Sequence, residues 1–124
     1  MFRDRRHGWR RTGALMAVAL FAMPPALLLR PAFAAEDLPV YKLVSRDGAF
    51  EPKTLTVPVG KRFKIEISND GKGAMEFESK DLKQEKVLAA GAKSSVVINP
   101  LKPGTYTFFD EYHMDAPKGK IVAK

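Results

Sequence analysis

Residues 106–122 read YTFFDEYHMDAPKGKIV, a pattern typical of a strand, a short polar loop and a second strand. Aromatic and β-branched residues favour strands, whereas the polar run that ends in a proline and a glycine favours a loop. Within six positions this loop brings together carboxylate, imidazole and thioether groups, at Asp110, Glu111, His113, Met114 and Asp115. Groups of this kind are metal ligands, so the loop is a candidate metal site.

The chain before this loop has the same strand-and-turn character. Apolar residues alternate with polar ones over residues 40–50, 54–59 and 63–69, and further strands are predicted at 74–79, 94–99, 105–109 and 119–124. Turn residues separate these runs, at 47–48, 70–73 and 103–104. Residues 80–94 are the one stretch with helical character, and Gly91 limits it to one or two turns or a loop. Six or seven short strands with regular turns predict an all-β protein, an antiparallel β-sandwich with Greek-key connections.

The first 34 residues have a different composition. A basic head, MFRDRRHGWRR, precedes the apolar run TGALMAVALFAMPPALLL and the small-residue segment Ala32–Phe33–Ala34. This order predicts a signal peptide over residues 1–34 that is cleaved to leave one domain, 35–124, in the periplasm. Gly13 and Ala14 follow Arg10–Arg11 where a twin-arginine signal prefers Phe-Leu, which favours Sec over Tat export. The alternative is an N-terminal membrane anchor, which ordinarily needs about 20 apolar residues.

The net charge and the reactive side chains exclude several classes of function. The whole chain has a net charge of +7, but residues 1–34 carry most of it and leave about +2 on residues 35–124. A nucleic-acid-binding role therefore loses its main support. The chain has no cysteine, and His113 is the one histidine of residues 35–124. With no nucleophile motif around that histidine and no glycine-rich phosphate loop, hydrolase and nucleotide-binding functions are not indicated.

Residues 38–124 resemble a cupredoxin. The resemblance rests on FEPKTLTVPVGKRFKIEISN at 50–69, LKPGTYTF at 101–108 and DEYHMDAPKGKIV at 110–122. In blue-copper cupredoxins two histidines, a cysteine and usually a methionine bind copper. The resemblance places Asp110 at the cysteine position, His113 at the second histidine, Pro117 at the methionine, and Met75 or Glu76 at the first histidine. A type-1 blue-copper centre requires a thiolate, so this chain does not form one.

A narrower similarity concerns iron. The segments MEFESKDLKQEKV at 75–87 and GTYTFFDEYH at 104–113 are similar to the EfeO-type cupredoxin-like domains of bacterial iron uptake. That similarity implies a periplasmic protein that binds copper or iron and works with an Ftr-type iron permease and associated periplasmic proteins. The implied roles are metal capture, hand-over or assisted oxidation of ferrous iron, with membrane contact only through the partner.

The predicted metal site combines a strand with the loop. Glu76 and Glu78 are two residues apart on a predicted strand and therefore share one face. The predicted ligands are Glu76, Glu78, Asp110, Glu111, His113 and Met114, with Met75 and Glu85 ranked lower. Carboxylates with one imidazole suit iron or Cu(II) better than Cu(I).

Simpler interpretations remain open at this point. The two glutamates also fit a solvated strand face, His113 also fits a hydrogen-bonded loop residue, and a one-residue change of register would exchange Met75 for Glu76. The rival function is a metal-free β-sandwich that uses the loop to bind another protein.

Overall fold

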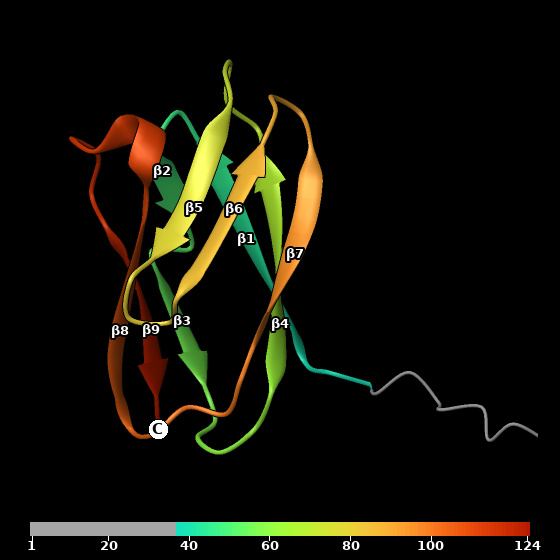
Figure 1. Cartoon of the computed structure of the whole chain (residues 1–124), viewed down its shortest axis with the longest axis vertical. Helices are drawn as coiled ribbons and strands as arrows, with labels where there is room; N and C mark the ends of the chain where they lie inside the picture. The colour runs from blue at the N-terminus through green and yellow to red at the C-terminus, as the bar shows by residue number, and fades with distance from the viewer. Residues whose placement is uncertain (1–36) are drawn as a thin grey trace, which may run out of the picture. The chain divides into compact units, whose positions relative to one another are not determined.

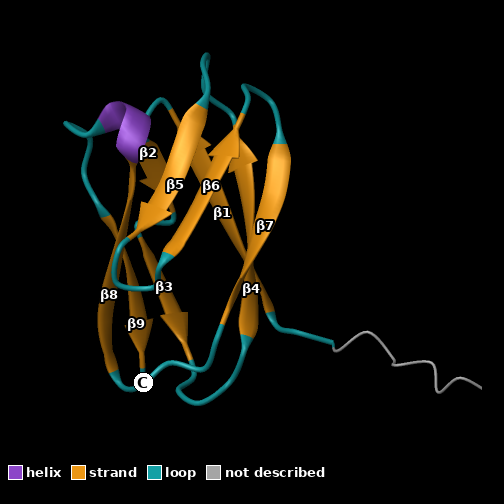
Figure 2. Cartoon of the chain, in the orientation of Figure 1, coloured by secondary structure: helices purple, strands orange, loops and turns teal. Residues whose placement is uncertain are grey.

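A computed structural model describes residues 37–124 of the chain. In this range the backbone forms nine strands and one short 3-10 helix, coloured by type in Figure 2. They are β1 (Val40–Arg46), β2 (Ala49–Glu51), β3 (Thr54–Val57), β4 (Phe63–Asn69), β5 (Met75–Ser79), β6 (Gln84–Leu88), β7 (Lys93–Ile98), β8 (Gly104–Asp110), η1 (Glu111–His113) and β9 (Gly119–Ala123). The predicted signal peptide and its cleavage site lie outside the described residues and stay predictions.

The strands form the two layers of a β-sandwich (Figure 1). One sheet has the order β2-β1-β4-β7, and the other has the order β3-β9-β8-β5-β6. The predicted all-β sandwich is confirmed, but both sheets are mixed, because β1 pairs parallel with β4 and β3 pairs parallel with β9. The parallel pairing of β1 and β4 arises because the chain crosses to the other sheet at β3 before it returns as β4.

The core lies between the two layers and follows the alternation in the sequence. In β4 every second side chain, at Phe63, Ile65 and Ile67, points into the core and is fully buried. Rings from different strands meet edge to face, with the Phe50 and Phe108 centroids 5.0 Å apart. Buried rings in this geometry stabilise beyond the area they remove from water, so these contacts hold the two sheets together.

The prediction of helical turns or a loop over residues 80–94 is wrong where strands form, at 84–88 and 93–94, and right for the turns at 80–83 and 89–92. Residues 80–83 form a turn, and β6 then pairs antiparallel with β5 along its whole length. The residues of β6 favour helices in isolation, but ladder hydrogen bonds to β5 and the burial of Leu88 override that preference. This hairpin places Glu85 directly opposite Glu78.

Residues 35–124 form one compact unit that contains every strand and the whole core. Because none of the described core contacts depends on residues before Asp37, we expect this segment to fold on its own. Within residues 37–124 there is no helix with the length and apolar character needed to cross a bilayer.

Candidate metal centre

Asp110, the last residue of β8, is a buried carboxylate with both oxygens occupied. Its Oδ1 accepts hydrogen bonds from the backbone N–H groups of Glu76 and Tyr112, each at 3.0 Å. Its Oδ2 lies 2.7 Å from Nδ1 of His113, which donates to it in the tautomer protonated at Nδ1. One buried side chain thus links β5, β8 and η1.

His113 sits against the turn between β1 and β2. Gly48 in that turn has a positive φ of 94°, and a Cβ there would lie 2.5 Å from Cβ of His113. Glycine therefore meets both the backbone and the steric requirement at this position. The imidazole is one-third exposed, and within residues 37–124 no hydrogen-bond partner is found for its Nε2.

The four positions that bind copper in blue-copper cupredoxins do not fit that metal here. Met75 points inward from β5 and is part of the core, with 1% of its surface exposed. Asp110 and Nδ1 of His113 are bonded to each other, and Pro117 has no donor side chain. The expectation that no type-1 centre forms rests on the missing thiolate, and the geometry gives no alternative copper cage at these positions.

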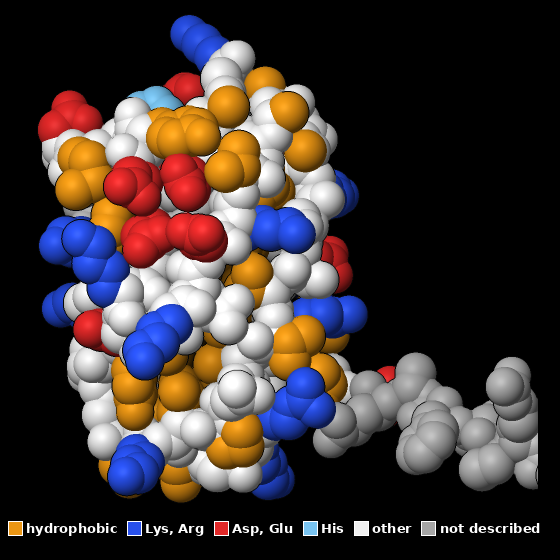
Figure 3. Space-filling view, in the orientation of Figure 1, with side chains coloured by type: hydrophobic (Ala, Val, Ile, Leu, Met, Phe, Trp, Pro, Cys, Tyr) orange, Lys and Arg blue, Asp and Glu red, His pale blue; other side chains and the backbone are white. Residues whose placement is uncertain are grey.

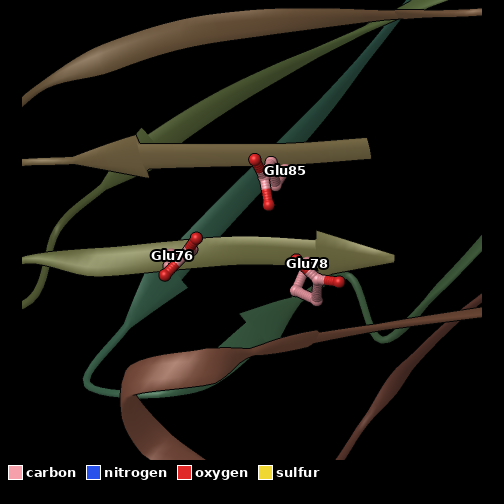
Figure 4. Close-up of side chains that lie close together, drawn as sticks. All are labelled: Glu76, Glu78 and Glu85. Atoms are coloured by element: carbon pink, nitrogen blue, oxygen red, sulfur yellow. The ribbon is translucent and has the colours of Figure 1, made fainter. Parts of the chain in front are cut away.

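A different group of ligands gathers on the outer face of β5 and β6. Carboxylate oxygens of Glu76, Glu78 and Glu85 all lie within 4.8 Å of one another (Figure 4). We call these three residues the glutamate cluster. Glu76 and Glu78 share a face because Met75, Phe77 and Ser79 between and beside them point into the core.

The glutamate cluster is electrostatically unfavourable without a cation. Partial burial raises the pKa of Glu76, and the negative charges of Glu111, Glu85, Glu78 and Asp110 raise it further. Glu78 and Glu85 are direct cross-strand partners, an arrangement that destabilises a sheet when both carry the same charge. Acidic side chains are accordingly concentrated on one half of the face seen in Figure 3.

Lysines and aromatic residues border the glutamate cluster. Phe109, the cross-strand partner of Glu78, is buried outside the main core, and Nζ of Lys80 and of Lys118 lie 5.9 and 5.3 Å from its ring centroid. Nearby, Oδ2 of Asp81 accepts hydrogen bonds from the backbone N–H and the hydroxyl of Thr107, and these bonds lower the pKa of Asp81. The two lysine ammonium groups thus lie near the ring of Phe109.

The structure divides the predicted ligands into three groups. Glu76 and Glu78 come together with the lower-ranked Glu85, and Glu111 is close enough to act on the charge of Glu76. Asp110 and His113 form a separate hydrogen-bonded pair. Met114 is 60% exposed, whereas Met75 is in the core. A metal role for any of these residues stays a prediction.

Asn69 has a structural role that was not predicted from the sequence. This fully buried amide donates from Nδ2 to the carbonyls of Gly73, Leu88 and Ala89, and its Oδ1 accepts from the N–H of Gly71. It therefore fixes the turn that enters β5 against the end of β6. The signal in the sequence was an asparagine directly before the turn DGKG.

Comparison with known proteins identifies the family and supports the fold. The cupredoxin-like domain family matches residues 13–123 of the chain. An uncharacterized protein of Rickettsia prowazekii is 33% identical over 81 residues, which is 65% of each chain, so this chain spans about two thirds of that relative.

Solved structures share the fold at low identity. The purple cupredoxin of Nitrosopumilus maritimus is 17% identical with a TM-score of 0.53, covering 67% of this chain and 98% of its own. An auracyanin of Roseiflexus castenholzii is 17% identical with a TM-score of 0.59, covering 68% and 96%. The metal-binding domain of a Cu(I)-exporting P-type ATPase of Streptococcus pneumoniae, solved with Cu(I), is 12% identical with a TM-score of 0.61, covering 73% and 90%. With the family matched over nearly its whole length, the chain belongs to the cupredoxin-like domain family.

Proposed function

We propose that the protein is an exported metal-binding cupredoxin that holds a divalent or trivalent metal ion at the glutamate cluster. The observation that carries the proposal is the approach of three carboxylates, from Glu76, Glu78 and Glu85, to within 4.8 Å of one another. A cation would neutralise charges that otherwise repel one another across the β5–β6 ladder.

The donor chemistry favours iron or Cu(II) over Cu(I). The cluster offers oxygen atoms alone, and Glu111 adds a further negative charge beside Glu76. Oxygen donors suit hard and borderline ions, whereas Cu(I) prefers sulfur. The structural neighbours named with copper, such as the ATPase domain with Cu(I), support a metal-binding role in general.

We further propose that the metal is cargo in bacterial iron acquisition. The support is the similarity of 75–87 and 104–113 to EfeO-type domains, which implies an Ftr-type iron permease as the partner. Capture and hand-over require no redox step. Oxidation of ferrous iron would in addition require an electron acceptor.

Calorimetric titration of residues 35–124, stripped of metal, tests the proposal. We expect binding of Fe(II) under anaerobic conditions or of Cu(II), and we expect the double variant E78Q/E85Q to weaken it at least about 10-fold. The matched control is Glu66→Gln, which removes a glutamate from β4 in the other sheet and should leave binding unchanged.

His113→Ala separates the glutamate cluster from the loop as the metal site. Binding retained in this variant supports the cluster. Binding lost in His113→Ala but kept in E78Q/E85Q would place the site in the loop instead. Absence of binding of either metal by the folded protein would overturn the proposal.

A second candidate function is protein binding without a metal. The observation that favours it is the exposure of three large apolar side chains, Val87 on β6 and Tyr112 and Met114 beside η1, each more than half exposed. Exposed apolar side chains among acidic ones fit a basic, partly apolar partner segment. Under this alternative, metal ions leave the thermal stability unchanged, and Tyr112→Ala with Met114→Ala weakens partner binding.

A further inference from the structure

The end of the sandwich away from the glutamate cluster carries exposed lysines on three separate segments. Lys61 lies in the loop between β3 and β4, Lys102 lies in the loop between β7 and β8, and Lys124 follows β9. We call these three residues, with the exposed Val59, the basic end. In Figure 1 the loop after β3 and the C-terminus lie at the end of the molecule opposite to η1.

Hydrogen bonds between the segments hold the basic end in one shape. The N–H of Gly60 donates to the carbonyl of Leu101 at 3.0 Å, and the N–H of Lys124 donates to the carbonyl of Val57 at 3.1 Å. The hydroxyl of Tyr106 donates to the carbonyl of Lys102 at 2.9 Å. The lysines are therefore presented together from a fixed surface rather than from independent loops.

The described chain also begins at this end. Asp37, Leu38 and Pro39 line a groove together with Gly60, Lys61 and Pro100. In the sequence, seven residues separate this entry point from the apolar run at 12–29. A leader or an anchor over that run would end seven residues before Asp37 in the sequence, and this short distance favours a membrane surface as the partner of the basic end.

We propose that the basic end rests on a membrane surface through anionic phospholipid headgroups. Lysine ammonium groups near an anionic bilayer gain electrostatic energy within about a Debye length of the surface. Val59, 37% exposed at the tip of its loop, adds an apolar contact at the headgroup boundary. The contact is weak and reversible, and it does not depend on metal binding at the other end.

Vesicle sedimentation with residues 35–124 tests the proposal at low ionic strength. We expect binding to vesicles that contain 30% phosphatidylglycerol and none to purely phosphatidylcholine vesicles. The double variant K61Q/K102Q should bind about 30-fold more weakly, since each cation near such a surface strengthens partitioning about 5-fold. Both side chains are exposed, so thermal unfolding should be unchanged.

The control removes two lysines of equal charge from the opposite end. Lys72 lies in the turn before β5 and Lys93 begins β7, so K72Q/K93Q should retain nearly all binding. Equal loss in both double variants would overturn the proposal, because binding would then follow net charge. Failure to bind the anionic vesicles would overturn it as well. Stronger binding to heparin or duplex DNA, with the same dependence on Lys61 and Lys102, would show a general polyanion site and contradict lipid as the ligand.

Discussion

At the scale of single residues, Asp110 shows how one side chain can exchange a ligand role for a structural one. The resemblance to blue-copper cupredoxins predicts a ligand position here, yet both oxygens of Asp110 are used in hydrogen bonds to Glu76, Tyr112 and His113. A buried carboxylate with three donors is stable without a metal. The pair it forms with His113 closes the position around which copper ligands would otherwise converge.

Replacing Asp110 should be costly to the fold. We expect Asp110→Ala to lower the free energy of unfolding by about 2–5 kcal/mol, because two partly buried backbone N–H groups and an imidazole lose their acceptor. Asp110→Asn keeps an oxygen for the two backbone donors and should cost clearly less. Urea denaturation of both variants gives the comparison, and equal losses would mean that the backbone bonds contribute little.

The pKa of Glu76 predicts how stability depends on pH. Because its pKa is raised in the folded protein, the folded state binds more protons than the unfolded state above the ordinary glutamate pKa. Stability of the metal-free protein should therefore fall as the pH rises through the titration of Glu76. Glu76→Gln should raise the melting temperature at pH 7 and have little effect at pH 3, where the carboxyl is protonated in both states. A melting temperature unaffected by Glu76→Gln at pH 7, or raised equally by the control Glu66→Gln, would contradict this.

At the scale of elements, β6 is the strand on which the site depends. It is an edge strand whose residues alternate between solvent and core only at its end, where Leu88 is buried and Val87 is exposed. We expect Leu88→Ala to cost about 2–4 kcal/mol in unfolding free energy and Val87→Ala to cost less than about 0.5 kcal/mol. Chemical denaturation of the two variants measures the difference.

The strands with strict alternation could be predicted from the sequence, and β6 could not. In β4 the residues Phe63, Ile65 and Ile67 mark one buried face. The sequence therefore predicts both the strand and the side that faces the core. In β6 the first three residues, Gln84, Glu85 and Lys86, are polar, and they favour a helix equally well. The tertiary pairing with β5 is what makes this segment a strand rather than a helix.

The candidate site could likewise be predicted from the sequence only in part. Glu76 and Glu78 are adjacent on one face by strand geometry alone, which the sequence indicates. Glu85 joins them through the register of the β5–β6 hairpin. That register cannot be predicted before β6 is known to be a strand. The separation of Asp110 and His113 from the cluster depends on hydrogen bonds between β5, β8 and η1, which spacing in the sequence does not specify.

At the scale of the whole domain, the two proposed binding surfaces lie on different parts of the sandwich. The glutamate cluster lies on β5 and β6, and Lys61, Lys102 and Lys124 lie in loops or at the terminus at the opposite end. If the basic end rests on a bilayer as proposed, the glutamate cluster faces away from it. Metal capture and surface contact would then occur at different places on one small domain and would not compete.

Metal binding should stabilise the whole domain by mass action. At a free metal concentration 100 times the dissociation constant, the gain is about 2.7 kcal/mol, which for a domain of this size corresponds to roughly 10–20 °C in melting temperature. Thermal unfolding with and without Fe(II) or Cu(II) measures the shift. The E78Q/E85Q protein should show a small fraction of it, and an equal shift in that variant would mean that the ion binds elsewhere.

The place of β9 has a consequence for how the protein is made. This last strand lies in the interior of its sheet, between β3, to which it is parallel, and β8. The early strand β3 therefore has no neighbour to pair with until residues 119–123 have been synthesised. Since such long-range pairings form late, the second layer should close only when the final strand arrives. Removing those few residues would take away an interior strand and leave β3 without a partner, rather than shorten an edge of the sheet.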